Sequence, residues 1–362
     1  MTDNWFISRT FSRGKYPKRP RMIANFAITY ACDSRCRTCN IWKIQSKEHE
    51  LSLDEIRSTF RDNQEFLSEV RYIQITGGEP FLRADLPEII SAIRTYLPKC
   101  TFWIPTNGLN PELIKQVARQ ILDVLDGNGL GVSVSLDGIG ATHDKLRGVA
   151  GSYSNAVETL EKLAHMRKEY PKFNLTVGMT LTPDNLRELP EVFQLARRHE
   201  AEFSFRPVNF SDIYYRNPEG NFKLNGVIND LTRSIEPIKR DVVKRRGILG
   251  SVTTLRYMEG VLDYVRSSRV ENFPCTAGSA SMFIDPSGNV YPCIIMNKKL
   301  GNIRDKPLRD MWISHEAEES RRLIREGKCP GCWVECESFR DIHHDRMGII
   351  RSMFRAIHYR LT

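Results

Sequence analysis

Long hydrophobic runs are absent from this sequence. No stretch of its 362 residues reaches the roughly 20 consecutive apolar side chains that a membrane-spanning helix requires. Residues 1–22 are basic and lack an apolar segment, so we do not expect a secretory signal. Internal repeats and low-complexity tracts are also missing. Hydrophobic residues make up 41% and charged residues 27%, so we expect a folded, cytoplasmic protein.

Cysteine is missing from the long middle of the chain, between Cys100 and Cys275. The nine cysteines gather instead at two places, three in residues 32–39 and five in residues 275–336. Such clustering, without a secretory signal, favours metal ligation in a reducing compartment over structural disulfides. Cys100 stands alone, and we expect it to be a buried, inert thiol.

Acidic residues are absent from the last 17 positions, which contain four arginines. Residues 1–22 likewise carry six basic side chains against one acid, Asp3, and the net charge of the chain is +9. Basic ends of this kind are either solvated arms or contacts to an anionic substrate, a membrane surface or a nucleic acid.

Strand-like and helix-like segments alternate through the first half of the chain. Strands are predicted at 22–30, 71–76, 101–106, 131–136, 174–181 and 202–208, and helices at 52–67, 86–97, 110–125, 152–170 and 186–200. Ser52 and Glu55 form a capping box at the start of the first helix. Strict alternation predicts a parallel sheet with right-handed crossovers. Six units suit an α/β fold, a partial (β/α)6 TIM-like barrel.

Changes in composition predict five parts along the chain. A basic N-terminal arm covers 1–21, the partial barrel 22–210, a polar helical bridge 211–270, a small cysteine-rich domain 271–342, and a basic amphipathic C-terminal helix 343–362. In parallel barrels the chemistry gathers at the C-terminal ends of the strands. Functional residues are therefore expected at those ends.

The first predicted strand ends at Cys32, Cys36 and Cys39, a C-x3-C-x2-C run. Three thiolates can hold a 4Fe–4S cluster and leave one iron open to a small molecule. A zinc site lacking one ligand, or three inert thiols, would give the same pattern. The next strand ends carry GGEP at 77–80 and TNG at 106–108.

The order of these motifs resembles the radical S-adenosylmethionine superfamily: C-x3-C-x2-C, GGEP, TNG, then SVSLDG and HDKLRGVAGSY within 133–153. The resemblance implies that Cys32, Cys36 and Cys39 hold a 4Fe–4S cluster whose open iron binds S-adenosylmethionine. It also implies five further residues that contact this cofactor, namely Gly77, Gly78, Glu79, Ser135 and Arg147.

The residue types agree with these implied roles. Paired glycines allow a close backbone approach, a carboxylate such as Glu79 suits an ammonium group, and Arg147 can grip a carboxylate. Thr38 departs from the family, which commonly has an aromatic or large apolar residue before the third cysteine. Adenine packing is therefore expected from neighbours such as Ile41 or Trp42.

A second set of cysteines comprises Cys275, Cys293, Cys329, Cys332 and Cys336. This set resembles the SPASM/twitch extension of radical S-adenosylmethionine enzymes, which implies one auxiliary 4Fe–4S cluster. We favour the first four as ligands, with Cys336 in place of Cys329 or Cys332 as the alternative. A structural zinc site remains open, because C-x2-C spacing also permits it.

The resemblance implies an iron–sulfur enzyme that reductively cleaves S-adenosylmethionine to a 5′-deoxyadenosyl radical and abstracts a substrate hydrogen. An auxiliary cluster suggests oxidation or bond formation on a peptide or anionic small molecule, with flavodoxin or ferredoxin as the reducing partner. Redox-neutral epimerisation or isomerisation is the alternative. A non-catalytic iron–sulfur sensor or nucleic-acid-binding protein is the other class, but aromatic-basic RNA motifs are absent.

Candidate substrate contacts are Arg206 and Asn209 at the sixth strand end and Asp285 in the second domain. No residue is assigned as a catalytic acid or base. The tail is expected to be an amphipathic helix that packs on the barrel or lies peripherally on an anionic membrane. Its apolar stripe comprises Met347, Ile350, Phe354, Ile357 and Leu361.

Overall fold

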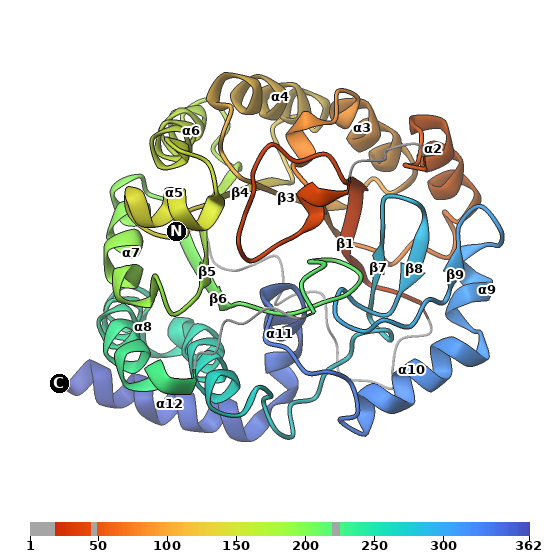
Figure 1. Cartoon of the computed structure of the whole chain (residues 1–362). Coiled ribbons are helices and arrows are strands. Elements are labelled where there is room, and N and C mark those ends of the chain that lie inside the picture. Colours follow the sequence, from red (N-terminus) through yellow and green to blue (C-terminus); the bar gives the residue numbers. More distant parts are fainter. Residues whose placement is uncertain (1–18, 45–48, 219–224) are drawn as a thin grey trace.

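A single nine-stranded sheet forms the centre of the molecule (Figure 1). The computed structural model describes residues 19–44, 49–218 and 225–362, so most of the predicted basic arm at 1–21 lies outside the described residues. The strands are β1 Met22–Thr29, β2 Tyr72–Gly77, β3 Thr101–Thr106, β4 Leu130–Ser135, β5 Asn174–Leu181, β6 Glu202–Pro207, β7 Ser281–Ile284, β8 Asn289–Tyr291 and β9 Gly301–Asn302. Their order across the sheet is β6-β5-β4-β3-β2-β1-β7-β8-β9.

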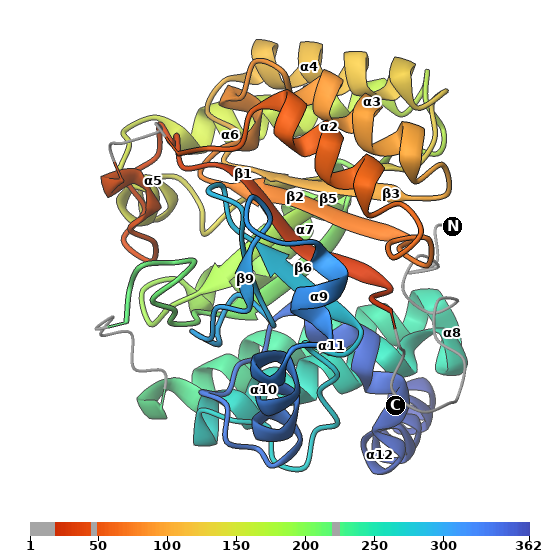
Figure 2. The ribbon, with the colours of Figure 1, turned by 90° about the vertical axis from the view of Figure 1, so that its right-hand side faces the viewer.

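Helices cover the outside of this sheet (Figures 1 and 2). They are α2 Leu53–Asp62, α3 Leu86–Tyr96, α4 Pro111–Val124, α5 Ala141–Arg147, α6 Ser152–Met166, α7 Leu189–Arg198, α8 Ile228–Ser267, α9 Leu308–Trp312, α10 His315–Arg325, α11 Glu335–Asp341 and α12 Arg346–Leu361. Short 3-10 turns are η1 Ile41–Lys43, η2 Pro80–Leu82, η3 Leu186–Glu188, η4 Asn225–Val227 and η5 Ile342–His344. No helix within the described ranges is long and apolar enough to cross a bilayer.

Strands β1 to β6 pair in parallel with their sequence neighbours, which confirms the predicted partial barrel. Side chains alternate between its two faces. On β2, Ile73 and Ile75 are fully buried in the hydrophobic core, whereas Gln74 between them lines the barrel cavity. The barrel therefore has an apolar outer layer under the helices and a polar interior.

The C-terminal strands continue the same sheet. Strand β7 pairs in parallel with β1, placing Met22 opposite Ser281 and Phe26 opposite Ile284, and β7, β8 and β9 follow as antiparallel neighbours. Strand β1 thus has the barrel on one side and the cysteine-rich part on the other (Figure 1).

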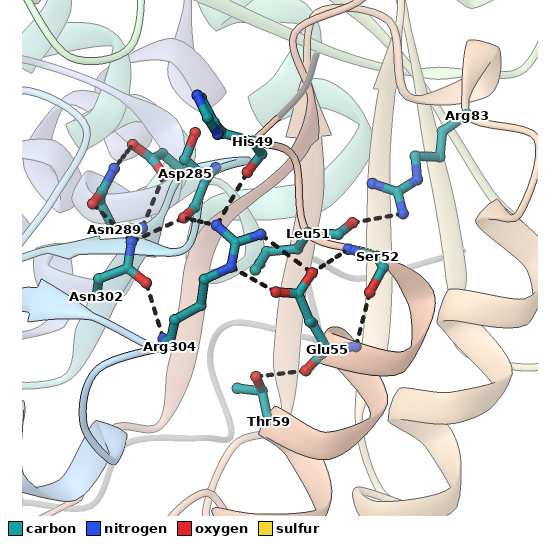
Figure 3. A network of polar contacts seen from close by, with 11 residues as sticks. His49, Leu51, Ser52, Glu55, Thr59, Arg83, Asp285, Asn289, Asn302 and Arg304 are labelled. Carbon is teal, nitrogen blue, oxygen red and sulfur yellow. Dashed lines mark hydrogen bonds and ion pairs between the residues drawn. The ribbon is translucent and has the colours of Figure 1, made fainter.

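An ion pair across this junction joins the β8–β9 region to the start of α2 (Figure 3). Arg304 Nε lies 2.6 Å from Glu55 Oε1, and its Nη1 donates to the carbonyl of Ser287 at 3.1 Å. Glu55 also completes the predicted capping box with Ser52. The hydrogen bond from Arg304 lowers the pKa of Glu55 to about 2.

Helix α8 follows η4 and closes the open side of the barrel near β6 (Figure 1). It bends at Gly247, whose φ of 69° and ψ of −178° interrupt the helical geometry. Tyr257 on α8 donates its hydroxyl to the carbonyl of Phe205 on β6 at 2.9 Å, and Trp333 Nε1 donates to the carbonyl of Tyr257 at 3.0 Å. Buried polar bonds of this kind fix α8 against both the barrel and the segment before α11.

Helix α12 packs along α8, but the apolar stripe is not what attaches it (Figure 1). Its buried positions are Gly348, Ser352 and Ala356, whereas Phe354 and Leu361 of the predicted stripe are exposed. The expected helix therefore packs on its own chain, but along α8 and not through the apolar stripe. Small side chains let two helices approach closely. The spacing of large apolar residues in the sequence does not reveal such a contact.

We predict that Gly260→Ala destabilises the protein. A Cβ at Gly260 would lie 2.0 Å from the Trp333 ring, which is only 1% exposed and cannot move aside. The free energy of unfolding should fall by about 1–3 kcal/mol in denaturant titrations of the iron-free chain, although alanine is normally the better helix former. Gly226→Ala is the control, because its Cβ meets nothing within 4 Å. Unchanged stability in Gly260→Ala would contradict the packing described.

Candidate active site

The loop after β1, residues 30–40, carries the first three cysteines and is called the cysteine loop below. Its base is bonded to the end of β2: the N–H of Gly78 donates to the carbonyl of Thr29 at 2.9 Å, and the N–H of Glu79 donates to that of Ala31 at 2.8 Å. The GGEP segment therefore supports the cysteine loop through its backbone.

The two glycines of GGEP are required by this contact. A Cβ at Gly77 would lie 2.2 Å from the carbonyl oxygen of Thr29, and one at Gly78 would lie 2.1 Å from that of Ala31. Only glycine allows two backbones to approach so closely. From the sequence, the two glycines were expected to allow a close approach to a ligand. The structure adds a second reason for them, the close approach of the cysteine loop.

The far side of the cysteine loop is bonded to the C-terminal end of α5. The N–H groups of Arg35 and Arg37 donate to the carbonyls of Arg147 and Leu146, both at 2.9 Å. Gly148 ends this helix with a φ of 68°, and a Cβ there would lie 2.3 Å from the carbonyl oxygen of Arg35. The terminal carbonyls of a helix need such partners.

Cys32, Cys36 and Cys39 line one cavity of about 320 Å³ inside the barrel. Burial raises the pKa of Cys39 to about 12 and also raises that of Cys32, with Cys36 adding to both shifts. A thiolate is costly here unless a positive group such as an iron cluster compensates it. In the described ranges, no group of three or more His, Cys, Asp or Glu side chains is arranged to hold a metal ion.

Arg147 faces these thiols across the cavity. Its Nη2 lies 2.8 Å from Asp137 Oδ2, and its Nη1 lies 3.8 Å from Cys36 Sγ. Burial alone would lower the pKa of Arg147, but Asp137 and Cys36 raise it overall. Its Nε is buried and finds no partner among the described residues. A donor left in this way is suited to an anionic group bound in the cavity.

Glu79 is 2% exposed and bridges two loops of the site. Its Oε1 accepts from the N–H of Phe81 at 3.2 Å, and its Oε2 accepts from the N–H of Asn107 at 2.6 Å. Asn107 Nδ2 in turn donates to Asp33 Oδ1 at 2.6 Å, which joins the TNG loop to the cysteine loop. Burial raises the pKa of Glu79 to about 7, so a nearby ammonium would favour its charged form.

Ser135, at the end of β4, lines the same cavity, as do the candidate adenine neighbours Ile41 and Trp42. The indole Nε1 of Trp42 donates to the carbonyl of Cys39 at 2.9 Å, which folds its ring back on the cysteine loop. All eight residues predicted around the first cluster and S-adenosylmethionine therefore lie at one cavity.

The opposite part of the cavity is formed by β6, α11 and the segment after β6. Arg206 Nη1 lies 3.5 Å from Glu335 Oε2, and Ser204 donates to Glu335 Oε1 at 2.7 Å. Tyr214 and Tyr215 pack edge to face with ring centroids 4.8 Å apart. Arg206 thus places a half-buried positive charge on the wall formed by β6 and α11.

Two of the predicted substrate contacts, Asn209 and Asp285, bond to groups of the protein itself. Asn209 lines the cavity, but its Nδ2 donates to the carbonyl of Pro207 at 2.8 Å and its Oδ1 accepts from the N–H of Trp333. Asp285 lies outside the barrel cavity, in the β7–β8 turn, where its carboxylate accepts from Ser287 and Asn289 (Figure 3). Asp285 is thus absent from the cavity that the three cysteines line, and its contact with a substrate stays a prediction.

The second set of cysteines surrounds the hydrophobic cluster beside β7 and α11. Burial raises the pKa of Cys332, and the charges of Cys293, Cys275, Glu337 and Cys329 add to this shift. All five thiols belong to this cluster or pack against it, and the choice of four of them as ligands stays a prediction.

The fifth thiol, Cys336, is oriented differently. It lines the barrel cavity, and Asn25 Nδ2 on β1 donates to its Sγ at 3.5 Å. Gln74 on β2 donates to Asn25 Oδ1 at 2.9 Å, so the barrel interior supplies the partners of this thiol. Burial raises the pKa of Cys336, with the charge of Glu337 adding to the shift.

Several residues of this cavity were not predicted from the sequence. Asp137 belongs to the SLDG segment, but only its contact with Arg147 in the structure identifies it as a residue of the site. Asn25 and Gln74 carried a detectable signal, since each is a polar residue inside an otherwise apolar strand. Tyr214 and Glu335 come from segments with no such pattern.

Comparison with known proteins agrees with the site. Residues 26–196 match the model of the radical SAM superfamily, and residues 275–337 match SPASM, an iron–sulfur cluster-binding domain. An AdoMet-dependent heme synthase from Methanosarcina barkeri is 26% identical, covering 86% of this chain and 88% of the relative. The mycofactocin maturase MftC of Mycolicibacterium smegmatis is 27% identical, covering 86% and 74%.

Solved structures share the fold. The crystal structure of Streptococcus suis SuiB bound to S-adenosylmethionine superposes with a TM-score of 0.61 at 16% identity, covering 84% of this chain and 68% of SuiB. Native anSMEcpe with bound AdoMet gives a TM-score of 0.60 at 16% identity, covering 92% and 98%.

Fold and site together define an iron–sulfur enzyme with a partial TIM barrel. The chain belongs to the radical SAM superfamily and carries a C-terminal SPASM domain. Its cofactors are a 4Fe–4S cluster, S-adenosylmethionine and an auxiliary iron–sulfur cluster.

We predict that Gly148→Ala displaces the cysteine loop. Alanine would strain the positive φ and collide with the carbonyl of Arg35, so the chain should bind less iron after anaerobic reconstitution. Gly151→Ala is the matched control, because its φ of 78° is equally strained but its Cβ meets nothing within 4 Å. Equal iron content in both variants would contradict the anchoring role of α5.

Proposed function

We propose that this enzyme abstracts a hydrogen atom from a peptide or an anionic small molecule and completes a net oxidation or bond formation. When bound, the reduced 4Fe–4S cluster and S-adenosylmethionine supply the 5′-deoxyadenosyl radical that performs the abstraction. Relatives that align with most of this chain support these substrate classes, since they include an AdoMet-dependent heme synthase and a PqqA peptide cyclase. An electron donor of the flavodoxin or ferredoxin type is part of the proposal.

The chain's own residues hold and orient these groups. We assign Cys32, Cys36 and Cys39 to the cluster. The unpartnered Nε of Arg147 is available to an anionic group, while Asp137 fixes the rest of its guanidinium. An arginine fixed in this way loses little freedom when it binds.

Four residues are assigned to S-adenosylmethionine itself, namely Gly77, Gly78, Glu79 and Ser135. Glu79 suits the methionine ammonium, because its buried carboxylate is favoured in the charged form by a positive neighbour. Gly77 and Gly78 hold the GGEP backbone close to the cysteine loop, so groups that bind here are oriented relative to the cluster.

One observation carries the proposal: the three-cysteine loop and Arg206 line the same barrel cavity. A radical formed beside the cysteines would meet a substrate bound at the Arg206 wall without leaving the barrel. Arg206 is held by Glu335 at 3.5 Å, a distance that leaves donors of the guanidinium for a substrate carboxylate. This supports an anionic group on the substrate.

The reaction class is tested by cleavage of S-adenosylmethionine. A reduced, iron-reconstituted preparation should form 5′-deoxyadenosine and methionine, and Cys36→Ala should abolish both products because one iron loses its thiolate. Cys100→Ala is the control, since Cys100 is buried beneath the barrel helices and outside the cavity. Cleavage by Cys36→Ala at the wild-type rate would overturn the assignment.

We further propose that Cys275, Cys293, Cys329 and Cys332 hold the auxiliary cluster and that Cys336 does not. With two four-iron clusters, about eight irons per chain are expected. Cys332→Ser should lose about half of them, whereas Cys336→Ser should keep them all. Iron determination on anaerobically purified variants measures this, and iron loss in Cys336→Ser would show that the fifth thiol is a ligand.

A further inference from the structure

The outward face of α12 differs from the rest of the surface. It consists of six apolar side chains that are between 37% and 81% exposed, namely Met347, Ile350, Met353, Phe354, Ile357 and Leu361. Ten large apolar side chains are exposed in the described part of the chain, and six of them lie on this one helix. Single exposed apolar residues are normal, but a continuous stripe marks an interaction surface.

Attachment of α12 to the protein does not use this face. The residues buried against α8 are Gly348, Ser352 and Ala356, each four positions apart and on the opposite side of the helix. A Cβ at Gly348 would lie 2.1 Å from Arg256 Nε, so the contact there is already close. Removing apolar side chains from the outward face should therefore leave the docking of α12 intact.

Acidic groups near α12 are turned toward the protein. Asp345 caps the helix and pairs with Arg256 at 2.6 Å. Glu259 accepts from Ser352 at 3.0 Å, and Glu236 accepts from the hydroxyl of Tyr359 at 2.8 Å. These carboxylates lie at the inner side of the helix, and Glu259 offsets the charge of Arg355, with which it pairs.

The outer surface of α12 is therefore apolar and positive. Its charged residues are Arg346, Arg351, Arg355 and Arg360, and the helix contains no acid. All four arginines belong to exposed positions beside the stripe, although Arg355 also pairs with Glu259 at 3.1 Å. An apolar stripe flanked by arginines is the pattern of a helix that lies in a membrane interface.

We infer that the outward face of α12 docks the enzyme on an anionic lipid bilayer. The apolar side chains would enter the boundary between head groups and acyl chains, and the arginines would reach the negatively charged head groups. A second copy of the chain fits this face poorly, because symmetric pairing would bring the same four arginines together. The inference does not depend on the proposed reaction.

The position of α12 agrees with such docking. It lies at the edge of the molecule beyond α8, and in Figure 2 it is at the opposite end from α2, α3 and α4. A bilayer could therefore contact its whole length while the barrel helices on the far side stay clear of the surface.

Vesicle sedimentation with the full-length, iron-reconstituted enzyme tests the inference. The probes are vesicles of equal parts phosphatidylcholine and phosphatidylglycerol, and vesicles of phosphatidylcholine alone. We expect binding to the anionic vesicles, weakened by added salt. The double variant Ile350→Ser/Phe354→Ser should bind at least about tenfold more weakly, because the buried apolar area is lost. Arg351→Gln/Arg360→Gln should bind the anionic vesicles more weakly than wild type.

Ile313→Ser is the matched control, since Ile313 is 66% exposed but follows α9, away from the stripe. It should bind as wild type does. Cleavage of S-adenosylmethionine and the unfolding midpoint of every variant should be unchanged, which separates lost docking from lost folding. Equal binding by the Ile350/Phe354 variant, no preference for anionic lipid, or a dimer in sedimentation velocity that these serines dissociate would each overturn the inference.

Discussion

The active site depends on two backbone contacts that hold the cysteine loop from opposite sides. At its base, the Gly77–Gly78 pair lies against the end of β1 at a distance that excludes any side chain. At its far side, the last carbonyls of α5 accept N–H groups of the loop. Because backbone atoms do the holding, the thiol side chains stay free to face the cavity. A rigid support of this kind is what a cluster with an open coordination position requires.

Arg147 connects this support to the chemistry of the cavity. Its carbonyl is one of the α5 groups that bind the loop, while its guanidinium extends to Asp137 and Cys36. The residue that positions the cysteines therefore also supplies a positive charge next to them. A buried charge is costly unless it is paired. Asp137 pairs with the Arg147 guanidinium, and the Nε of Arg147 is still available as a donor to a bound group.

Strand β1 links the two halves of the molecule. It ends in the cysteine loop, and it pairs with β7 of the SPASM part along its other edge. Helix α11 then carries Glu335 and Cys336 into the barrel cavity, close to Arg206 and Asn25. The two cysteine-rich regions consequently share one sheet, so packed structure sets their separation.

The sequence by itself determined the barrel and the cluster loop, because both are local. Alternating apolar runs predicted the six parallel strands, and the order of the C-x3-C-x2-C, GGEP and TNG motifs, through its resemblance to a known family, predicted a cluster at Cys32, Cys36 and Cys39. Tertiary structure alone decided that Cys336 turns to Asn25 in the barrel cavity, since these two residues lie more than 300 positions apart. It also decided that α12 packs through Gly348, Ser352 and Ala356, because periodicity identifies an apolar face but cannot say whether that face is buried.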